Sequence, residues 1–181
     1  IRQEGENDSR VCQIIRQDSL DEFICFTKEK KLKYSSSIPK SFLETHSFLI
    51  RNESISIIEY AAFFGSIQIV KFLLQKNIEL PSSLWLCAIH SKNMELIHLL
   101  EKNQIKPEYD SFETCFIESL KCHHNDIAHY IQTTYMSENE STQNNDYFYN
   151  YSNYYNFEFF PNDLIDDYDS IFETACQQDY S

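Results

Sequence analysis

The sequence is poor in turn-forming residues and in long apolar runs. It has only 2 glycines and 4 prolines among 181 residues, which disfavours a sheet-rich fold with many tight turns and favours helices joined by Asn, Ser and Asp turns. No apolar run is long enough for a membrane-spanning helix, and the polar N-terminal residues contain no signal-peptide core. We therefore expect an all-α protein without membrane insertion, located inside the cell, in the cytoplasm or the nucleus.

Basic residues are missing from the last third of the chain. All 15 lysines and arginines lie at or before Lys121. Of the 28 acidic residues, 17 precede Lys121 and 11 follow it, where no base is present. An acidic segment of this kind is repelled by nucleic acid and by anionic membranes, so we expect neither of them as a partner.

Cysteines are present, but their spacing does not indicate disulfides. The six lie at positions 12, 25, 87, 115, 122 and 176, mostly on apolar helical faces rather than in closely spaced loops. Buried free thiols in a reducing compartment are the simplest interpretation.

A helix-turn-helix pattern in residues 56–75 recurs along the chain. Its first helix carries the small pair Ala61 and Ala62, Gly65 interrupts the helix at the turn, and the second helix is apolar over most of its circumference. Because a helix pair with so much apolar surface cannot stand alone, it needs neighbouring copies. Copies align at residues 83–97 and 114–128, and half a copy aligns at residues 170–176.

Capping signals mark the ends of the expected helices. Ser66 is placed to cap the second helix of the first complete unit. Asn77 and Asn103 follow second helices, and we expect them in the left-handed conformation that ends a helix. Capping boxes, with Glu three residues after Ser, are predicted at Ser19 and Glu22, at Ser56 and Glu59, and at Ser170 and Glu173.

The pattern resembles the ankyrin repeat, a helix-turn-helix unit with a loop, of about 33 residues. Ser56-Ile-Ile-Glu-Tyr-Ala-Ala stands where the family's first helix opens, and Gly65-Ser-Ile-Gln-Ile-Val-Lys-Phe-Leu-Leu matches its turn and second helix. Segments such as Cys122-His-His-Asn-Asp-Ile-Ala are similar to the divergent ankyrin repeats of a large, functionally uncharacterised protist family. The resemblance extends over about residues 9–133 and 169–181, and it implies a protein-binding scaffold.

These observations predict an ankyrin-like repeat solenoid with two additions. The solenoid is expected over residues 9–136, followed at 137–168 by a disordered, acidic, Asn- and Tyr-rich insertion and at 169–181 by the first half of a truncated repeat. Because the chain stops after that half unit, we expect it to be a fragment of a longer repeat protein. Within the solenoid the expected parts are a capping unit (9–33), an insert (34–54) and repeats at 55–80, 81–106 and 107–136.

Potential chemistry is confined to one cluster of His, Cys and Asp side chains in the range Cys122–His129. The spacing typical of zinc sites is absent there, and the chain has no glycine-rich phosphate loop. A cysteine with a histidine could act as nucleophile and base, but no third orienting residue is recognisable. We therefore expect a non-enzyme without catalytic residues, metal or cofactor. A metal-dependent enzyme or a redox protein using this cluster is the alternative.

We expect the chain to be a monomer. The resemblance also implies where a protein partner binds it. In ankyrin-like stacks the residues after the small pair of each first helix, together with the loop tips, line the concave face. Phe63 and Phe64 would form an exposed hot spot there unless residues 34–54 cover them. The acidic aromatic segment 137–168 is a second candidate for partner recruitment. By position, the candidate partner-binding residues are Asn52, Glu53, Phe63, Phe64, Glu79, Ser82, His90, Ser91, Tyr109, Asp110, Glu113, Lys121 and Cys122.

Overall fold

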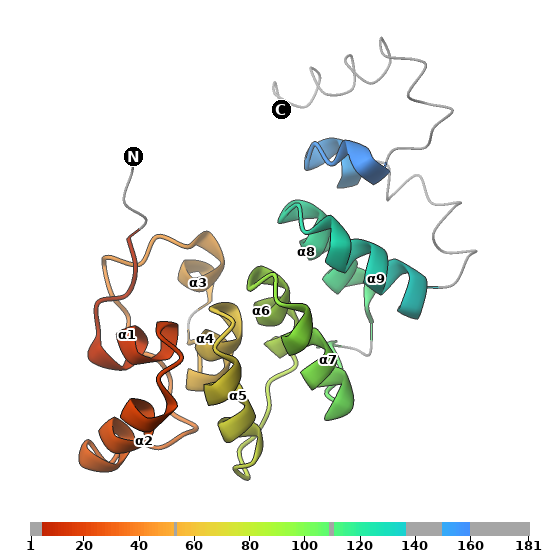
Figure 1. Ribbon diagram of the computed structural model, residues 1–181. Coiled ribbons are helices and arrows are strands. Elements are labelled where there is room, and N and C mark those ends of the chain that lie inside the picture. Colours follow the sequence, from red (N-terminus) through yellow and green to blue (C-terminus); the bar gives the residue numbers. More distant parts are fainter. Residues whose placement is uncertain (1–4, 53, 109–110, 137–149, 160–181) are drawn as a thin grey trace, which may run out of the picture. The chain divides into compact units, whose positions relative to one another are not determined.

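The computed structural model describes residues 5–52, 54–108, 111–136 and 150–159 (Figure 1). Within these ranges the regular structure is helical and no strand forms, apart from one isolated bridge between Ser37 and Ser56. The expected all-α class is thus confirmed for the described ranges, where no helix is long and apolar enough to cross a bilayer. The helices are α1 (Arg10–Arg16), α2 (Leu20–Glu29), α3 (Ser47–Arg51), α4 (Ile57–Phe63), α5 (Ile67–Leu74), α6 (Leu84–His90), α7 (Met94–Lys102), α8 (Glu113–Lys121), α9 (Asn125–Tyr135) and the 3-10 helix η2 (Phe157–Phe159).

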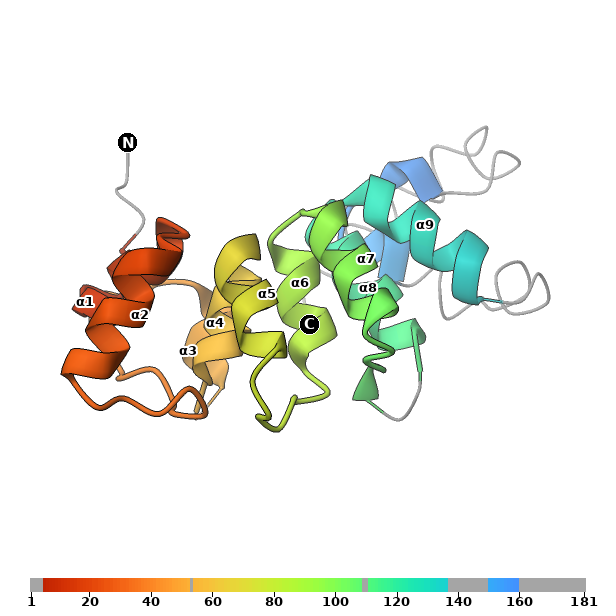
Figure 2. The ribbon, with the colours of Figure 1, turned by 60° about the horizontal axis from the view of Figure 1, so that its bottom comes forward.

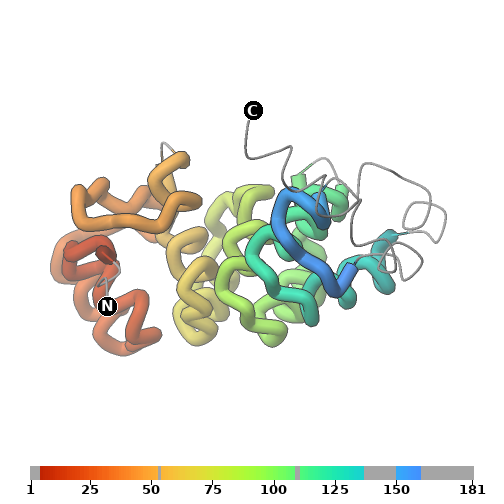
Figure 3. Tube along the Cα trace, turned by 90° about the horizontal axis from the view of Figure 1, so that it is seen from above, coloured from red at the N-terminus to blue at the C-terminus, as the bar shows by residue number. Residues whose placement is uncertain are grey.

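The chain divides into two compact units, residues 1–108 and 109–181. In the first unit, α1 and α2, α4 and α5, and α6 and α7 form three helix pairs. Successive pairs lie side by side, with α1 and α6 both packed against α4, and α2 packed against α5 (Figures 2 and 3). Ala61, Ala62 and Ala88 are fully buried, and small side chains of this kind allow two helix backbones to approach closely.

The same tight turn joins the two helices in each of the four helix pairs that the structure describes. Each turn contains one residue in the left-handed conformation, and the amide of this residue donates to the carbonyl three residues earlier. These bonds satisfy carbonyls that the end of a helix leaves unpaired. The left-handed residues are Asp18 (φ 48°), Gly65 (φ 69°), Lys92 (φ 52°) and His123 (φ 54°), so only one of the four turns uses glycine.

The predicted capping box of α4 is confirmed. The Ser56 hydroxyl accepts from the Glu59 amide at 3.3 Å, and the Glu59 carboxylate accepts from the Ser56 amide at 2.8 Å. The box predicted at Ser19 and Glu22 is wrong, because Ser19 makes no side-chain cap and the Glu22 carboxylate pairs with Arg10 on α1 instead.

The cap of α5 comes from another helix pair. Ser66 makes no side-chain cap, contrary to expectation; its hydroxyl donates to the carbonyl of Ile15, at the end of α1, over 2.6 Å. The Asp18 carboxylate takes over the capping role, accepting from the amides of Gln68 and Ile69 at 2.9 and 3.0 Å. The helix dipole also favours a carboxylate at a helix N-terminus. The bonds from Ser66 to α1 and from α5 to Asp18 therefore link the first helix pair to the second.

The left-handed conformation predicted for Asn77 and Asn103 is wrong at both positions. Asn103 has φ −90° and ψ 8°, and its side chain donates to the Leu99 carbonyl at 2.7 Å. This bond keeps Asn103 in the last turn of α7, so the left-handed residue is the next one, Gln104, with φ 55°.

In the second unit, α8 packs on α9, and residues 150–159 form a further helix end, turn and η2. Tyr155 is the left-handed residue of this turn, with φ 51°. The buried side chain of Asn156 donates to the Leu120 carbonyl over 3.1 Å. Ser66 makes the equivalent bond to Ile15 in the first unit, so residues 150–159 repeat the turn of a helix pair.

This order in residues 150–159 differs from the disorder that composition predicts for 137–168. The physical reason is that aromatic side chains can be buried on a helical neighbour even in a segment without bases. The Tyr151 and Phe159 rings stack at 5.8 Å, and both meet the Phe116 ring of α8 edge-on. The remaining parts of that segment (137–149 and 160–168), and residues 169–181 with the capping box predicted there, lie outside the described residues.

Glu158 attaches η2 to α9, and we expect this attachment to depend on pH. Hydrogen bonds from the side chains of Asn125 and His129, the latter over 3.0 Å, lower the pKa of the Glu158 carboxyl below its ordinary value of 4.5. Because the folded-state pKa is depressed, the contribution is present above the ordinary pKa and is lost as pH falls through the folded-state pKa. Amide exchange of residues 150–159, corrected for intrinsic rates, should therefore accelerate in acid. The Glu158→Gln variant lacks the titrating group, and an equal acceleration in that variant would contradict this prediction.

Candidate binding surface

An aromatic cluster covers the end of α4. Phe63 is the last residue of this helix, and its ring stacks on His90 of α6 at 5.0 Å. From residues 34–54, the Phe48 ring stacks on Phe63 at 5.8 Å and the His46 ring meets it edge-on at 5.4 Å. Phe48 also contacts His90, at 4.3 Å. Residues 34–54 thus pack on the ends of two successive helix pairs.

This cover decides how much of the predicted hot spot faces solvent. Phe63 is only 8% exposed. A partner could therefore not contact its ring without moving the insert. Phe64 is half-buried, with the Arg16 guanidinium 5.7 Å from its ring centre. His46 and Phe48 were not among the candidate residues. The signal that could have found them is the run Phe48-Leu49-Ile50, which makes the insert too apolar for a free loop.

Hydrogen bonds fasten the insert to the rest of the first unit. The Glu44 carboxylate accepts from the Asn7 amide at 3.3 Å and pairs with His46 Nδ1 at 2.6 Å. The Asn7 side chain donates to the Pro39 carbonyl at 2.6 Å, and the Ile38 amide donates to the Ile55 carbonyl at 2.7 Å. The insert is therefore held on the first unit through Ile38, Pro39 and Glu44.

The other candidates of the first unit are more accessible. Glu79 and Ser82 are exposed in the loop between α5 and α6, and Asn52 is exposed just after α3. His90 and Ser91 are half-buried, and the Ser91 hydroxyl donates to the Ala88 carbonyl at 2.6 Å. Three candidates, Glu53, Tyr109 and Asp110, lie outside the described residues.

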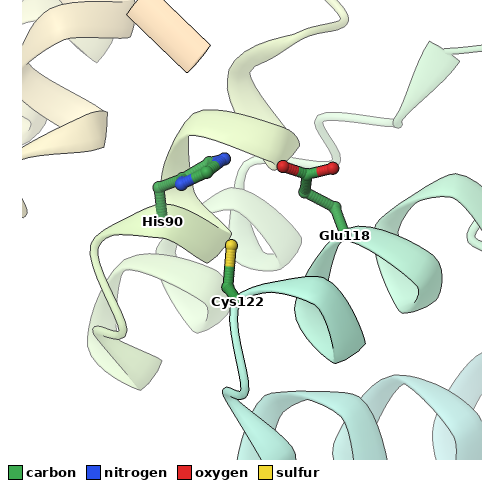
Figure 4. A group of neighbouring side chains, drawn as sticks. All are labelled: His90, Glu118 and Cys122. Atoms are coloured by element: carbon green, nitrogen blue, oxygen red, sulfur yellow. The ribbon is translucent and has the colours of Figure 1, made fainter. Parts of the chain in front are cut away.

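The described candidates of the second unit lie on α8 or directly after it. Glu113 is exposed in its first turn, and Lys121 is exposed at its end, where it pairs with Glu118 at 3.0 Å. Glu118 and Cys122 lie one helical turn apart (Figure 4). The figure also shows His90, which belongs to the first unit.

The thiols of the described residues are free, and four of them are poor nucleophiles. Burial raises the pKa of Cys122 to about 11, assisted by the Glu118 carboxylate and opposed by the Lys121 ammonium. Burial also raises the pKa of Cys115 to about 12, and it raises those of Cys12 and Cys87. Because the thiolate is the nucleophile and the metal ligand, these protonated thiols behave as apolar packing groups. Cys25 differs from the expectation of buried thiols, since it is exposed on α2.

The histidines in the range Cys122–His129 have roles in turns and packing. His123 is the exposed, left-handed residue between α8 and α9, and His124 precedes the first residue of α9. His129 pairs with Glu158 and stacks on the Phe159 ring at 4.4 Å. The positions of His123 and His124 follow from the turn between α8 and α9, and the contacts of His129 come from the packing of residues 150–159 on α9.

Comparison of the chain with protein-family models, with curated proteins and with solved structures gave no match.

Proposed function

We propose that this chain is an ankyrin-like repeat scaffold, without catalytic activity, that binds a protein partner through one face of its stacked helix pairs. The observation that carries the proposal is the recurrence of one turn, with its left-handed residue at Asp18, Gly65, Lys92, His123 and Tyr155. Equivalent side chains, Ser66 and Asn156, donate to equivalent carbonyls of the preceding helix pair. Repeated units of this kind present a regular row of loop tips, which suits contact with another protein.

The accessible loop between α5 and α6 is the part of this face that we propose for the first contact. Glu79 and Ser82 are exposed there, whereas Phe63 is covered by the insert. The protonated state of the buried thiols gives no support to nucleophilic or metal chemistry. We therefore assign recognition of the partner to the loop residues. The aromatic cluster holds the insert on the helix pairs.

The experiment is a quantitative pull-down from the native cell with the 181-residue chain as bait. In the double variant Glu79→Arg, Ser82→Arg, two new positive charges at the contact should reduce the recovered partner by about tenfold or more. The matched control is Gln75→Arg, an exposed change at the end of α5. Both variants should keep the parental melting temperature. Equal recovery with the double variant and the parent would contradict this placement of the contact.

A further inference from the structure

A lysine-rich segment runs from the end of α2 into the insert. Residues 28–40 contain five lysines and a single acidic residue, Glu29. All five lysines are exposed. Glu29 lies 3.0 Å from the ammonium of its neighbour Lys30, a contact too exposed to neutralise much charge. For Lys28, Lys33 and Lys40, no carboxylate among the described residues lies within ion-pair distance. This segment therefore carries a net positive charge, although the whole chain is acidic.

An apolar hollow opens in the middle of this basic segment. It has a volume of about 400 Å³, and Lys30 stands at its wall. We call it the basic hollow; its apolar lining is Val11, Phe26, Leu32, Ile38, Pro39 and Ile57. These residues come from α1, the end of α2 and the residues just after it, the insert and the start of α4. The insert therefore closes the hollow by returning across the first helix pair.

The charges around the basic hollow leave its lysines available. Arg10 also lines it, but its guanidinium is paired with Glu22 of α2. A second hollow of about 130 Å³ lies beyond Ile38 and Pro39, which line both. The acidic side chain that lines the second hollow, Glu44, is paired with His46. Lys40 also lines this second hollow, so exposed lysines border both hollows, with Lys30 at the wall of the basic hollow.

We propose that the basic hollow is a docking site for an acidic peptide segment of a partner protein, with one large apolar side chain inserted into the hollow. The apolar walls provide the burial that anchors a Leu, Ile or Phe side chain. The exposed lysines attract flanking Asp and Glu residues and discriminate against basic segments. This site is separate from the loop between α5 and α6, so it goes beyond the function proposed above.

Two properties of the binding follow from this geometry. Because the lysines are exposed, their attraction is screened by salt, and affinity should fall as the ionic strength rises from about 50 to about 500 mM. Because the anchor is buried in an apolar hollow, replacing the apolar residue of the peptide by alanine should weaken binding at low and high salt alike. Both effects are needed, since a lysine cluster without an anchor would show only the first.

The test starts with a phage-displayed library of random dodecapeptides, selected on the immobilised 181-residue chain. We expect selected peptides to combine acidic residues with at least one Leu, Ile or Phe. A labelled synthetic copy of the most enriched peptide is then titrated by fluorescence anisotropy. The variant Lys30→Glu, Lys33→Glu should weaken its binding by about tenfold or more. The matched control Lys102→Glu, Lys106→Glu, which reverses two lysines at and beyond the end of α7, should leave it within about twofold.

Several outcomes would overturn the proposal. One is a library that yields no acidic sequence, and another is an acidic peptide that binds Lys30→Glu, Lys33→Glu as tightly as the parent, with both proteins folded by circular dichroism. Binding to phosphatidylserine vesicles or to single-stranded DNA that is lost in this variant, without any acidic peptide, would assign the lysines to a lipid or nucleic-acid surface instead. A concentration-dependent dimer abolished by the same changes, with no acidic peptide selected, would assign the hollow to a second copy of the chain.

Discussion

Replacing Trp85 by alanine is expected to lower the free energy of unfolding by about 3–5 kcal/mol. Trp85 is 1% exposed, and its indole nitrogen donates to the Ile105 carbonyl at 2.7 Å. The change removes the largest buried side chain of α6 and also leaves that carbonyl without this donor. Trp85 is the single tryptophan of the chain, so the variant has no tryptophan fluorescence to follow. The loss in the free energy of unfolding is therefore measured by urea unfolding followed with far-ultraviolet circular dichroism.

Two control variants separate the contributions at this position. Trp85→Phe keeps an aromatic ring but removes the hydrogen bond, so its cost should be clearly smaller than that of alanine. Leu86→Ala changes the next residue, which is half-buried, and should also cost less. A loss below about 1 kcal/mol for Trp85→Ala would mean that α6 is not tightly packed in the first unit.

Replacing Phe116 by alanine is expected to have a similarly large effect on the second unit, also about 3–5 kcal/mol. Phe116 is fully buried on α8, and the rings of Tyr151 and Phe159 lie edge-on to it at 6.5 and 5.7 Å. Without it, residues 150–159 lose the apolar surface on which they pack. Hydrogen exchange followed by mass spectrometry should show faster exchange in residues 150–159 as well as in α8 and α9.

The matched control for this prediction is Tyr155→Ala. Tyr155 is 50% exposed, so truncation of its side chain should change the stability by no more than about 0.5 kcal/mol. If Phe116→Ala destabilised α8 but left the exchange of residues 150–159 unchanged, the packing of that segment on α8 would be contradicted.

The helix caps show which local signals were reliable. Ser56 and Glu59 form the predicted box because both partners lie within one helical turn and Glu59 Oε2 stays with Ser56, while its Oε1 accepts from the Ser83 hydroxyl. Ser19 and Glu22 have the same spacing, but Arg10 offers Glu22 a charged partner from α1. A capping signal read from sequence is therefore correct only where no residue from another helix binds the same group more strongly.

In the candidate site, too, the sequence placed some residues correctly and could not place others. The repeat alignment placed Phe63, Phe64 and His90 at the ends of first helices, and the rings of Phe63 and His90 do stack. The alignment could not place His46 and Phe48 over them, because the insert has no counterpart in the repeat. How far each aromatic ring faces solvent depends on this insert, and composition alone only indicated that the insert is too apolar to be a free loop.

The sequence by itself determined that the described chain is helical and that Ala61 and Ala62, Gly65 and Ser56 mark a helix pair. These features follow from local preferences: few turn residues, apolar periodicity, and one residue without a β-carbon at the turn. The tertiary structure alone decided that Asp18 rather than Ser66 caps α5, that the insert covers Phe63, and that residues 150–159 fold onto α8. Each of these joins residues far apart in the sequence, and its free energy comes from burial and hydrogen bonds that exist only once the helix pairs are packed together.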